Sequence, residues 1–385
     1  MRVVVDKNNP LVAEAFQQFG EVRALATKEI AASAIRDAEI VIVRSETKVT
    51  KELLLGSSIR FVGTATIGTD HVDVDFLRTH GIGFASAPGS NANSVAEYIV
   101  AALLTLAHRK GFVLQGKTIG VVGVGNVGSK VVRNVKALGM TVLQNDPPLY
   151  RITGNSHFVP LDDLMYADFI TLHVPLTTTG MDPTYHLFDA KRIGAMKKGA
   201  ILINTARGSV VDSAALSNAL DRRHLGGSVL DVWEGEPAID VELLKKIDIS
   251  TSHIAGYSFD GKLAAVEMMY AAACKFFSQV PKWTPEKSLP KPRVERIAVS
   301  ETGDSREETL RKIINQCYAI ECDDHSLRGI STVPGDDVRS YFARLRAEYG
   351  VRREFYNTTI ELPAALASME AVLKSLGFSV VNRRV

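Results

Sequence analysis

Short apolar segments recur through the middle of the chain, and this pattern constrains the fold more than any other feature. Between residues 118 and 256 six such segments, rich in β-branched side chains, are separated by helical stretches. Strands that are apolar almost throughout are typical of a parallel sheet covered by helices on both faces. The sequence therefore predicts a doubly wound α/β domain of the Rossmann type. Its predicted strands are residues 118–124, 140–144, 169–174, 200–205, 228–232 and 249–253.

An earlier series of shorter apolar segments shows the same alternation with helical stretches. It predicts another α/β domain, with a flavodoxin-like arrangement. Residues 93–107, apolar on nearly every side, predict a buried helix that connects the two domains and forms the hinge. A helical segment at 261–277 is expected to return to the first domain. We therefore assign residues 1–92 and 258–284 to the first domain and residues 93–257 to the second. The predicted strands of the first domain are residues 3–5, 22–25, 40–43, 61–64 and 82–86.

Four prolines between residues 281 and 292 predict a linker, because proline interrupts regular helix. The segment after this linker alternates expected strands and helices, which indicates a C-terminal α+β domain over residues 285–385. The 385-residue chain is long enough for three domains that each bury a core. The predicted strands are residues 293–299, 354–362 and the segment after Gly377, and the predicted helices are residues 306–318, 337–349 and 364–376.

Composition narrows the classes of function. A formal net charge of +2 offers no broad electrostatic surface for nucleic acid or for an anionic membrane. The longest apolar stretch, residues 98–107, is about half as long as a membrane-spanning helix. The N-terminus predicts an immediate strand rather than a signal peptide, and an odd number of cysteines favours a reducing compartment. We expect a cytoplasmic protein with no nucleic-acid or membrane partner. We also expect no metal site, since the surroundings of Cys317 and Cys322 do not complete a zinc spacing.

A glycine-rich motif follows the first strand of the middle domain. The strand runs into Gly123-x-Gly125-x-x-Gly128, after which a helix is predicted. In this context Gly123 permits a tight turn, Gly125 lets the backbone approach a pyrophosphate, and Gly128 allows the helix to pack closely on the strand. The N–H groups at the start of the helix can bind the phosphates. The motif therefore predicts a dinucleotide site.

Asp146 ends the next predicted strand, about 20 residues after the glycines, where a ribose-binding carboxylate is expected. Its charge favours NAD, because it can accept hydrogen bonds from a ribose diol but would repel a 2′-phosphate. Two alternatives stay open. Arg151 is close enough in sequence to compensate such a phosphate, and Asp146 could be only a turn residue before two prolines. NAD is the cofactor that we predict.

Three polar side chains near the ends of later strands fit the chemistry of a hydroxy acid. The guanidinium of Arg207 can bind a carboxylate through two parallel hydrogen bonds. His253 ends another strand, and an imidazole, with an ordinary pKa of ~6.5, can exchange a proton with a hydroxyl group. Glu236 would favour the protonated imidazole if the two side chains meet. The alternatives are a surface ion pair for Arg207 and a structural role for His253.

These motifs occur in an order that resembles the D-isomer-specific 2-hydroxy acid dehydrogenases. The resemblance covers the chain up to the proline linker. It implies that Arg207, Glu236 and His253 are catalytic. The motifs that carry it are the glycine motif, Asn204-Thr205-Ala206-Arg207-Gly208, Asp231-Val232-Trp233-Glu234-Gly235-Glu236-Pro237 and Ser252-His253-Ile254-Ala255-Gly256.

Further motifs, at residues 44–49, 63–73, 146–148 and 252–257, make the chain similar to one branch of this family. That branch oxidises 4-phospho-D-erythronate to 2-oxo-3-hydroxy-4-phosphobutanoate in the biosynthesis of pyridoxal 5′-phosphate (vitamin B6). The similarity implies a homodimer formed through the C-terminal domain. The residues that it places against substrate are Ser45, Thr66 and Tyr257. Those that it places along the NAD site are Gly123, Gly125, Asn126, Val127, Gly128, Asp146, Ala206, Asp231 and Gly256.

A phosphorylated substrate requires cations or backbone N–H groups opposite its dianionic end. Arg44 and Lys48, with residues 63–68, are candidates in the first domain. The candidates in the last domain are Arg346, Arg352 and Arg353, for which ordinary solvated charge is the alternative. Two other functions stay open: a 3-phosphoglycerate dehydrogenase, which shares the catalytic residues, and an NAD-sensing corepressor that binds protein partners.

Overall fold

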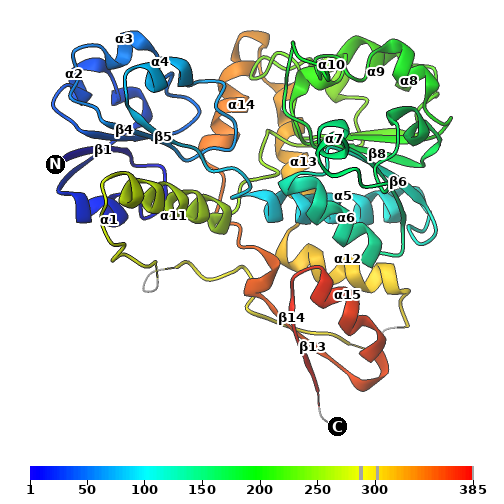
Figure 1. The fold of residues 1–385 in the computed structure, drawn as a ribbon. Helices are drawn as coiled ribbons and strands as arrows, with labels where there is room; N and C mark the ends of the chain where they lie inside the picture. The colour runs from blue at the N-terminus through cyan, green and yellow to red at the C-terminus, as the bar shows by residue number, and fades with distance from the viewer. Residues whose placement is uncertain (286–288, 301–302, 384–385) are drawn as a thin grey trace. The chain divides into compact units, whose positions relative to one another are not determined.

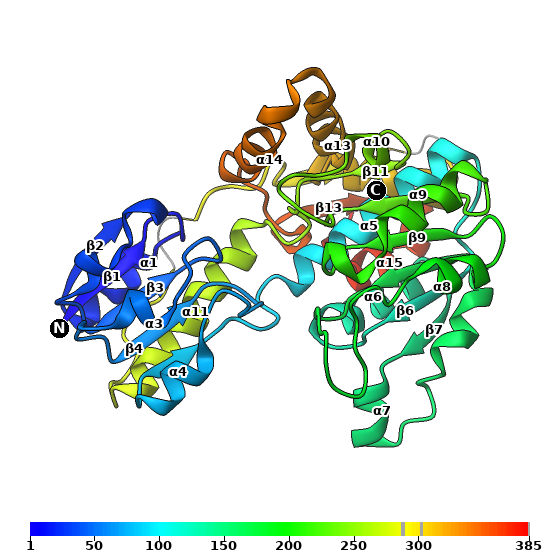
Figure 2. The ribbon, with the colours of Figure 1, turned by 90° about the horizontal axis from the view of Figure 1, so that it is seen from above.

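The computed structural model describes residues 1–285, 289–300 and 303–383 and divides into two compact units (Figures 1 and 2). The first unit contains Met1–Ala92 and Tyr257–Pro290, and the second contains Asn93–Gly256 and Lys291–Val385. The predicted proline linker has no regular secondary structure where it is described, and residues 286–288 within it lie outside the described residues. No helix in the described ranges is long and apolar enough to cross a membrane.

The first unit is built around a five-stranded parallel sheet with the strand order β2-β1-β3-β4-β5. This order is that of flavodoxin-like folds and confirms the second α/β domain. Helices cover both faces, with α1 and α11 packed on one face and α2, α3 and α4 on the other (Figure 1). The strands are β1 (Arg2–Asp6), β2 (Glu21–Leu25), β3 (Ile40–Val43), β4 (Phe61–Thr64) and β5 (Gly83–Ala85). The helices are α1 (Val12–Phe16), α2 (Ala32–Ile35), α3 (Lys51–Leu54), α4 (Val74–Thr79) and α11 (Phe259–Phe276).

The second unit contains a six-stranded parallel sheet with the order β11-β10-β9-β8-β6-β7. The predicted connecting helix is α5 (Ala92–Lys110), which packs with α6 (Asn126–Ala137) on one face of the sheet. The other face is covered by α8, α9 and α10, so the doubly wound fold is confirmed. The strands are β6 (Thr118–Val122), β7 (Thr141–Asn145), β8 (Phe169–Leu172), β9 (Ile201–Asn204), β10 (Gly227–Leu230) and β11 (Ile249–Ser250). The other helices are α8 (Ala190–Ala195), α9 (Ser213–Asp221) and α10 (Val241–Leu244).

The C-terminal region forms a three-stranded parallel sheet, β12-β13-β14, and four helices. Helices α12 and α15 pack with this sheet, whereas α13 lies against β11 and α14 packs on α13. Its apolar residues join the two cores of the six-stranded sheet, which is why it belongs to the second compact unit. The predicted strand at 354–362 is shorter in the structure, because residues 355–357 form a 3₁₀ turn. The strands are β12 (Arg296–Ala298), β13 (Thr359–Leu362) and β14 (Ser379–Asn382), and the helices are α12 (Arg306–Cys317), α13 (Ile320–Arg328), α14 (Val338–Ala347) and α15 (Glu370–Ser375).

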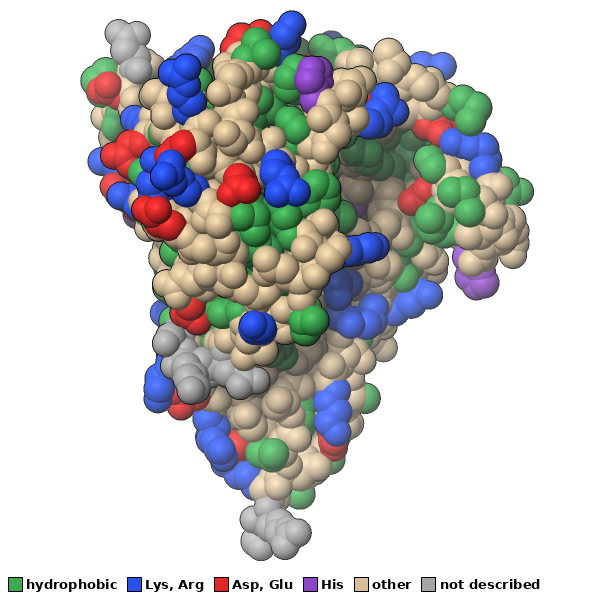
Figure 3. Space-filling model, turned by 60° about the vertical axis from the view of Figure 1, so that its left-hand side comes forward, with side chains coloured by type: hydrophobic (Ala, Val, Ile, Leu, Met, Phe, Trp, Pro, Cys, Tyr) green, Lys and Arg blue, Asp and Glu red, His purple; other side chains and the backbone are tan. Residues whose placement is uncertain are grey.

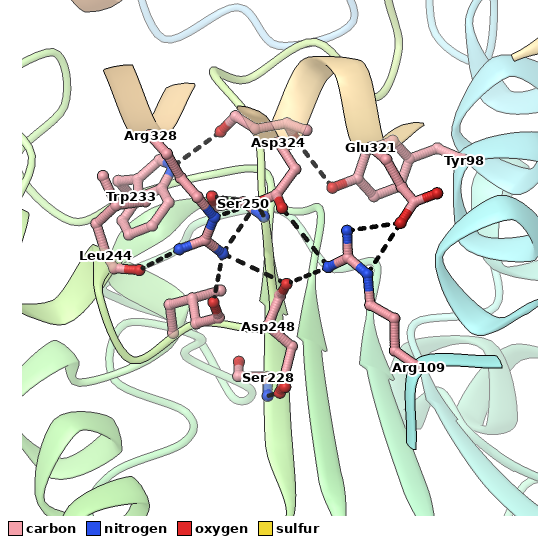
Figure 4. A network of polar contacts seen from close by, with 12 residues as sticks. Tyr98, Arg109, Ser228, Trp233, Leu244, Asp248, Ser250, Glu321, Asp324 and Arg328 are labelled. Carbon is pink, nitrogen blue, oxygen red and sulfur yellow. Dashed lines mark hydrogen bonds and ion pairs between the residues drawn. The ribbon is translucent and has the colours of Figure 1, made fainter. Parts of the chain in front are cut away.

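Helix α13, which was not predicted, lies on the edge strand β11 (Figure 4). Asp324 accepts hydrogen bonds from the backbone N–H of Ser250 at 2.9 Å and from its hydroxyl at 2.7 Å. Arg328 contacts the same carboxylate at 3.0 Å and donates to the carbonyl of Ile247 at 2.6 Å. An edge strand exposes unpaired backbone groups, so α13 closes this edge of the sheet.

The surface carries charges of both signs, and both occur on the face drawn in Figure 3. Several of the charges form local ion pairs within one unit, such as Lys110 with Asp248 at 2.6 Å and Arg296 with Glu361 at 2.6 Å. Paired charges of this kind cancel at short range and leave little long-range field.

Candidate functional site

The glycine-rich turn lies between β6 and α6 and has the geometry that a dinucleotide requires. Gly123 has a φ of 84°, and a Cβ there would lie 2.6 Å from the carbonyl oxygen of His173. A Cβ on Gly128 would lie 1.9 Å from the carbonyl oxygen of Gly123, so α6 can approach the turn only with glycine. A Cβ on Gly125 would instead point into open space, with nothing within 4 Å. The turn is therefore closed on the protein side and open where a pyrophosphate would approach.

Asp146 is held against this turn. Its carboxylate accepts hydrogen bonds from the backbone N–H of Val124 at 2.8 Å and of Leu149 at 2.9 Å. The second bond caps α7 (Pro147–Thr153), a helix that was not predicted. Arg151, the cation that might have served a 2′-phosphate, forms an ion pair with Asp182. The residues present fit NAD: an open glycine turn, a helix N-terminus and a carboxylate fixed beside them.

Arg207 follows β9 in a loop that is shaped by Asn204. The Asn204 side chain accepts from the N–H of Ala206 at 3.0 Å and donates to the carbonyl of Arg207 at 2.9 Å. A Cβ on Gly208 would lie 2.0 Å from the backbone carbon of Trp233. The loop of Arg207 therefore runs directly against the loop that carries Glu236.

Glu236 and His253 form the pair that the sequence could only suggest. The Nδ1 atom of His253 is hydrogen-bonded to Oε1 of Glu236, and the N–H of Trp233 donates to Oε2 of Glu236 at 3.1 Å. Burial by itself would raise the pKa of Glu236, but the hydrogen bond and charge of His253 outweigh it, with help from Trp233 and Arg346, so this pKa is lowered. The pairing leaves Nε2 of His253 as the atom that can exchange a proton with a substrate.

His253 adopts a left-handed backbone conformation, with a φ of 59°. A non-glycine residue keeps such a conformation only where its surroundings hold it. Asp231, which is 1% exposed, provides that support. Its carboxylate accepts from the backbone N–H groups of Ile254 at 2.7 Å and Ala255 at 3.0 Å, and its carbonyl accepts from the N–H of His253 at 2.7 Å. The turn also explains why β11 ends at Ser250, before the predicted end at residue 253.

His173 is a site residue that the sequence analysis missed. It follows β8, and its ring nitrogens lie 3.0 Å from the hydroxyl of Thr171 and 3.3 Å from that of Thr205, in the Arg207 loop. Burial lowers the pKa of His173 to about 3, so the imidazole is neutral at physiological pH. Its position at the carboxyl end of a strand, like that of His253, was the signal that could have revealed it.

Ser45, Thr66 and Tyr257 all belong to the first unit. Ser45 follows β3 and Thr66 follows β4, and these strands are paired with Val43 opposite Thr64, so both loops leave the same edge of the sheet. The hydroxyl of Thr66 lies 2.7 Å from that of Thr64 and donates to the carbonyl of Gly68 at 2.8 Å.

His71 contacts Thr64, which in turn contacts Thr66, and Tyr257 is contacted by Lys262. The Nε2 atom of His71 lies 2.9 Å from the hydroxyl of Thr64. The ammonium of Lys262 lies 4.6 Å from the ring centre of Tyr257, a cation–π contact.

The cationic candidates for a phosphate differ in burial. In the first unit Arg44 is half-buried and Lys48 is exposed. In the second unit Arg352 and Arg353 are 6% and 9% exposed. Ordinary solvated charge, the alternative for these two arginines, is therefore wrong. Arg346 contributes to the lowered pKa of Glu236, which places its charge near the catalytic pair.

Comparison with protein families gives two matches in different parts of the chain. Residues 96–255 match the family described as D-isomer specific 2-hydroxyacid dehydrogenase, NAD binding domain. Residues 288–377 match a family described only as a domain of unknown function.

Curated relatives match almost the whole chain. An erythronate-4-phosphate dehydrogenase from Salinibacter ruber is 45% identical over 96% of this chain and 96% of its own length. The protein of the same name from Escherichia coli strain K12 is 42% identical over 99% of both chains.

Among solved structures the chain is similar to D-lactate dehydrogenase from Aquifex aeolicus, complexed with NAD and lactic acid. The two share 28% identity, with a TM-score of 0.60 over 72% of this chain and 95% of that one. NAD⁺-bound 3-phosphoglycerate dehydrogenase from Entamoeba histolytica has 26% identity and a TM-score of 0.62, over 75% of this chain and 99% of that one.

Proposed function

The chain belongs to the D-isomer-specific 2-hydroxyacid dehydrogenases and, within them, to the erythronate-4-phosphate dehydrogenases, and from this premise we propose the roles of its residues. The reaction is the NAD-dependent oxidation of 4-phospho-D-erythronate to 2-oxo-3-hydroxy-4-phosphobutanoate, a step toward pyridoxal 5′-phosphate. The observation that carries the assignment of roles is the hydrogen-bonded pair of Glu236 and His253 beside the Arg207 loop.

His253 accepts the proton of the substrate's 2-hydroxyl group on Nε2 as the hydride leaves C2. Glu236, hydrogen-bonded to Nδ1, orients the imidazole and stabilises the imidazolium that forms. Arg207 binds the substrate carboxylate through its guanidinium and draws electron density from the developing carbonyl. Bound NAD supplies the hydride acceptor for this step.

The NAD site that we propose is the open glycine turn with its flanking loops. Gly123 and Gly125, with the N-terminus of α6 at Asn126, would bind the pyrophosphate. Asp146 would accept hydrogen bonds from the adenosine ribose. The other residues proposed to line the site are Val127, Gly128, Ala206, Asp231 and Gly256.

The substrate contacts that we propose come from the first unit. The loops that carry Ser45 and Thr66 leave the same edge of their sheet, and Arg44 and Lys48 lie in the Ser45 loop. Hydroxyl groups and cations of this kind suit a phosphate dianion and the hydroxyls of a four-carbon acid. Tyr257 completes the proposed set.

Turnover tests this function directly. The purified protein is incubated with NAD and either 4-phospho-D-erythronate or 3-phospho-D-glycerate, and nicotinamide reduction is followed at one pH. We expect a clear preference for the four-carbon acid. A preference for 3-phospho-D-glycerate would make the protein a 3-phosphoglycerate dehydrogenase with the same catalytic residues. NAD binding without turnover of either acid would favour the corepressor.

The domain division that we propose keeps three parts: residues 1–92 and 258–284 for substrate, residues 93–257 for NAD, and residues 285–385 for dimerisation. We also place the protein in the cytoplasm.

The C-terminal sheet ends in the edge strand β14, where Val381 is 45% exposed, and an exposed apolar edge can pair with a second copy.

Light scattering tests the proposed dimer. The intact chain should have the mass of two copies. Val381→Asp should shift it toward the monomer, whereas Val280→Asp, at a residue of the first unit that is 76% exposed, should not. A monomer at every concentration would refute the proposed homodimer. Deletion of residues 293–385 is a poorer test, because this region shares its core with the six-stranded sheet.

A further inference from the structure

A run of charged residues between α14 and β13 is buried. Arg352, Arg353 and Glu354 are 6%, 9% and 5% exposed. Removing charge from water is unfavourable unless each group is paired or hydrogen-bonded. We call residues 352–354 the buried charged segment. The contacts of Arg352 and Glu354 that follow lie outside the C-terminal sheet, so dimerisation through that sheet does not explain them.

Arg352 contacts two of the three segments at which the chain passes between the second unit and the first. Its Nη2 atom donates to the carbonyl of Ala255 at 2.6 Å and lies 3.4 Å from that of Ser94. Ala255 lies just before the crossing at residues 256–257, and Ser94 just after the crossing at residues 92–93. The ring of Tyr318 lies 4.4 Å from the guanidinium and supports it by a cation–π contact.

Glu354 strengthens the hold on the first of these crossings. Its carboxylate accepts from the side chain of Asn93 at 2.8 Å and from the hydroxyl of Ser94 at 2.6 Å. The next residue, Phe355, donates its N–H to Glu97 at 2.8 Å. A carboxylate at the start of α5 is also favoured by the helix dipole. The buried charged segment therefore fixes the first turn of the connecting helix.

The contact with Ala255 also reaches the catalytic histidine. Asp231 accepts hydrogen bonds from all three N–H groups of residues 253–255: its carboxylate takes those of Ile254 and Ala255, and its carbonyl takes that of His253. Arg352 holds the same loop by its carbonyl side, at Ala255. The left-handed conformation of His253 is thus enclosed between two buried charged groups.

We propose that Arg352 is a positioning residue for the dehydrogenase reaction, which fixes the loop of His253 and the two chain crossings at residues 92–93 and 256–257 from within the C-terminal region. This proposal rests on the proposed function for its kinetic part. Any change in the orientation of two units is taken up by the few residues that connect them. The C-terminal region therefore supports catalysis within its own chain, in addition to its proposed role in dimerisation.

Arg352→Lys tests this role, because lysine keeps the charge but lacks Nη2, the atom through which Arg352 makes both carbonyl contacts. We expect kcat with 4-phospho-D-erythronate to fall about tenfold while the Kd for NAD stays within about twofold, since small displacements of a reacting group slow chemistry steeply. Hydrogen exchange should become faster in peptides that cover residues 92–97 and 253–257.

Arg328→Lys is the matched control. Arg328 is a half-buried cation of the same C-terminal region, and it donates to the backbone carbonyls of Ile247 and Asp248, next to β11, rather than to those of residues 94 and 255 (Figure 4). We expect a similar loss of thermal stability, with kcat within about twofold of the wild type and unchanged exchange at residues 253–257. Equal losses of kcat in the two variants at equal stability would show that Arg352 is merely structural.

Failure of Arg352→Lys to fold and absence of activity in the wild type can be distinguished from failure of the proposal. If Arg352→Lys does not fold, Glu354→Gln is a milder change in the same segment, at the crossing of residues 92–93 that Arg352 also contacts, and unchanged exchange at residues 92–97 would then refute the proposal. If the wild type does not oxidise 4-phospho-D-erythronate, the proposed function fails. The exchange comparison between Arg352→Lys and Arg328→Lys still decides whether the crossings are held as described.

Discussion

The two large parallel sheets share one strand order but differ at the end of their first strand. The order β2-β1-β3-β4-β5 of the first sheet corresponds to β7-β6-β8-β9-β10 of the second, which adds β11. In the first sheet β1 ends in Asp6, a fully buried carboxylate that accepts from the N–H of Asn8 at 2.9 Å and from the hydroxyl of Thr27 at 2.6 Å. In the second sheet β6 ends in the open turn at Gly125. Topology provides the same edge twice, and the residues decide which edge binds a dinucleotide.

The loops at these edges also differ in how firmly they are held. In the second unit Asn204 and Asp231 fix the loops of Arg207 and His253 by buried hydrogen bonds. In the first unit Ser45 is exposed on its loop. Groups that take part in chemistry need fixed positions, whereas groups that bind substrate can adjust. Substitutions of the catalytic side chains in the second unit should therefore lower kcat, and substitutions of the proposed substrate contacts in the first should raise KM.

The largest effect is expected for His253→Ala. Without the imidazole, the proposed acceptor of the hydroxyl proton is missing, so kcat should fall by about 10³-fold or more. The Kd for NAD, measured by titration, should be unchanged. Thr66→Val, in the first unit, should raise KM with little change in kcat. Substantial turnover by His253→Ala would mean that His253 does not take part in proton transfer. It would also contradict the expected difference between kcat effects in the second unit and KM effects in the first.

Arg207→Lys is expected to have the next largest effect. Lysine keeps the positive charge but cannot bind a carboxylate through two parallel hydrogen bonds, so kcat/KM should fall by about 10²-fold. Steady-state kinetics at saturating NAD measures this value. An unchanged kcat/KM would mean that the substrate carboxylate is bound elsewhere, for example by the cations of the first unit.

The glycine turn allows two substitutions that separate binding from folding. Gly125→Ala adds a Cβ to open space, so the protein should fold normally and bind NAD about tenfold more weakly, a difference of about 1.4 kcal/mol. Gly128→Ala would place its Cβ 1.9 Å from a backbone oxygen and should lower the melting temperature. Calorimetry with NAD titration distinguishes them. Normal NAD affinity in Gly125→Ala would place the pyrophosphate away from this turn.

Much of this arrangement could be predicted, and the exceptions have physical causes. The strands of both sheets were predictable because parallel strands buried on both faces are apolar throughout. Helix α13 was missed because only Ile320 and Leu327 among its apolar residues are buried, while Asp324 is buried to bind the edge of β11. A helix with so few buried apolar residues has no periodic apolar pattern from which it could be predicted.

The site was predictable residue by residue but not as an assembly. Strand ends and the family resemblance indicated Arg207, Glu236 and His253. Sequence spacing could not show that Glu236 and His253 meet, because that contact depends on how two separate loops fold back. For Arg352 and Arg353 the sequence left phosphate binding and ordinary solvated charge open, since charge alone does not tell whether a side chain lies in water or under a loop.

The smallest expected effect concerns two histidines, one in each unit, whose pKa is lowered by burial. His173 has a pKa lowered to about 3 from 6.5 by burial, so between these values the unfolded chain binds a proton that the folded chain does not. Stability should therefore decrease as the pH falls below about 6.5, and His173→Asn should reduce that dependence. Burial also lowers the pKa of His71, but Asp70 opposes the shift, so His71→Asn should change the pH dependence less. Melting temperatures of the three proteins, recorded from about pH 5 to pH 8, measure both effects. An equal pH dependence in the wild type and His173→Asn would mean that this imidazole is accessible to protons in the folded protein.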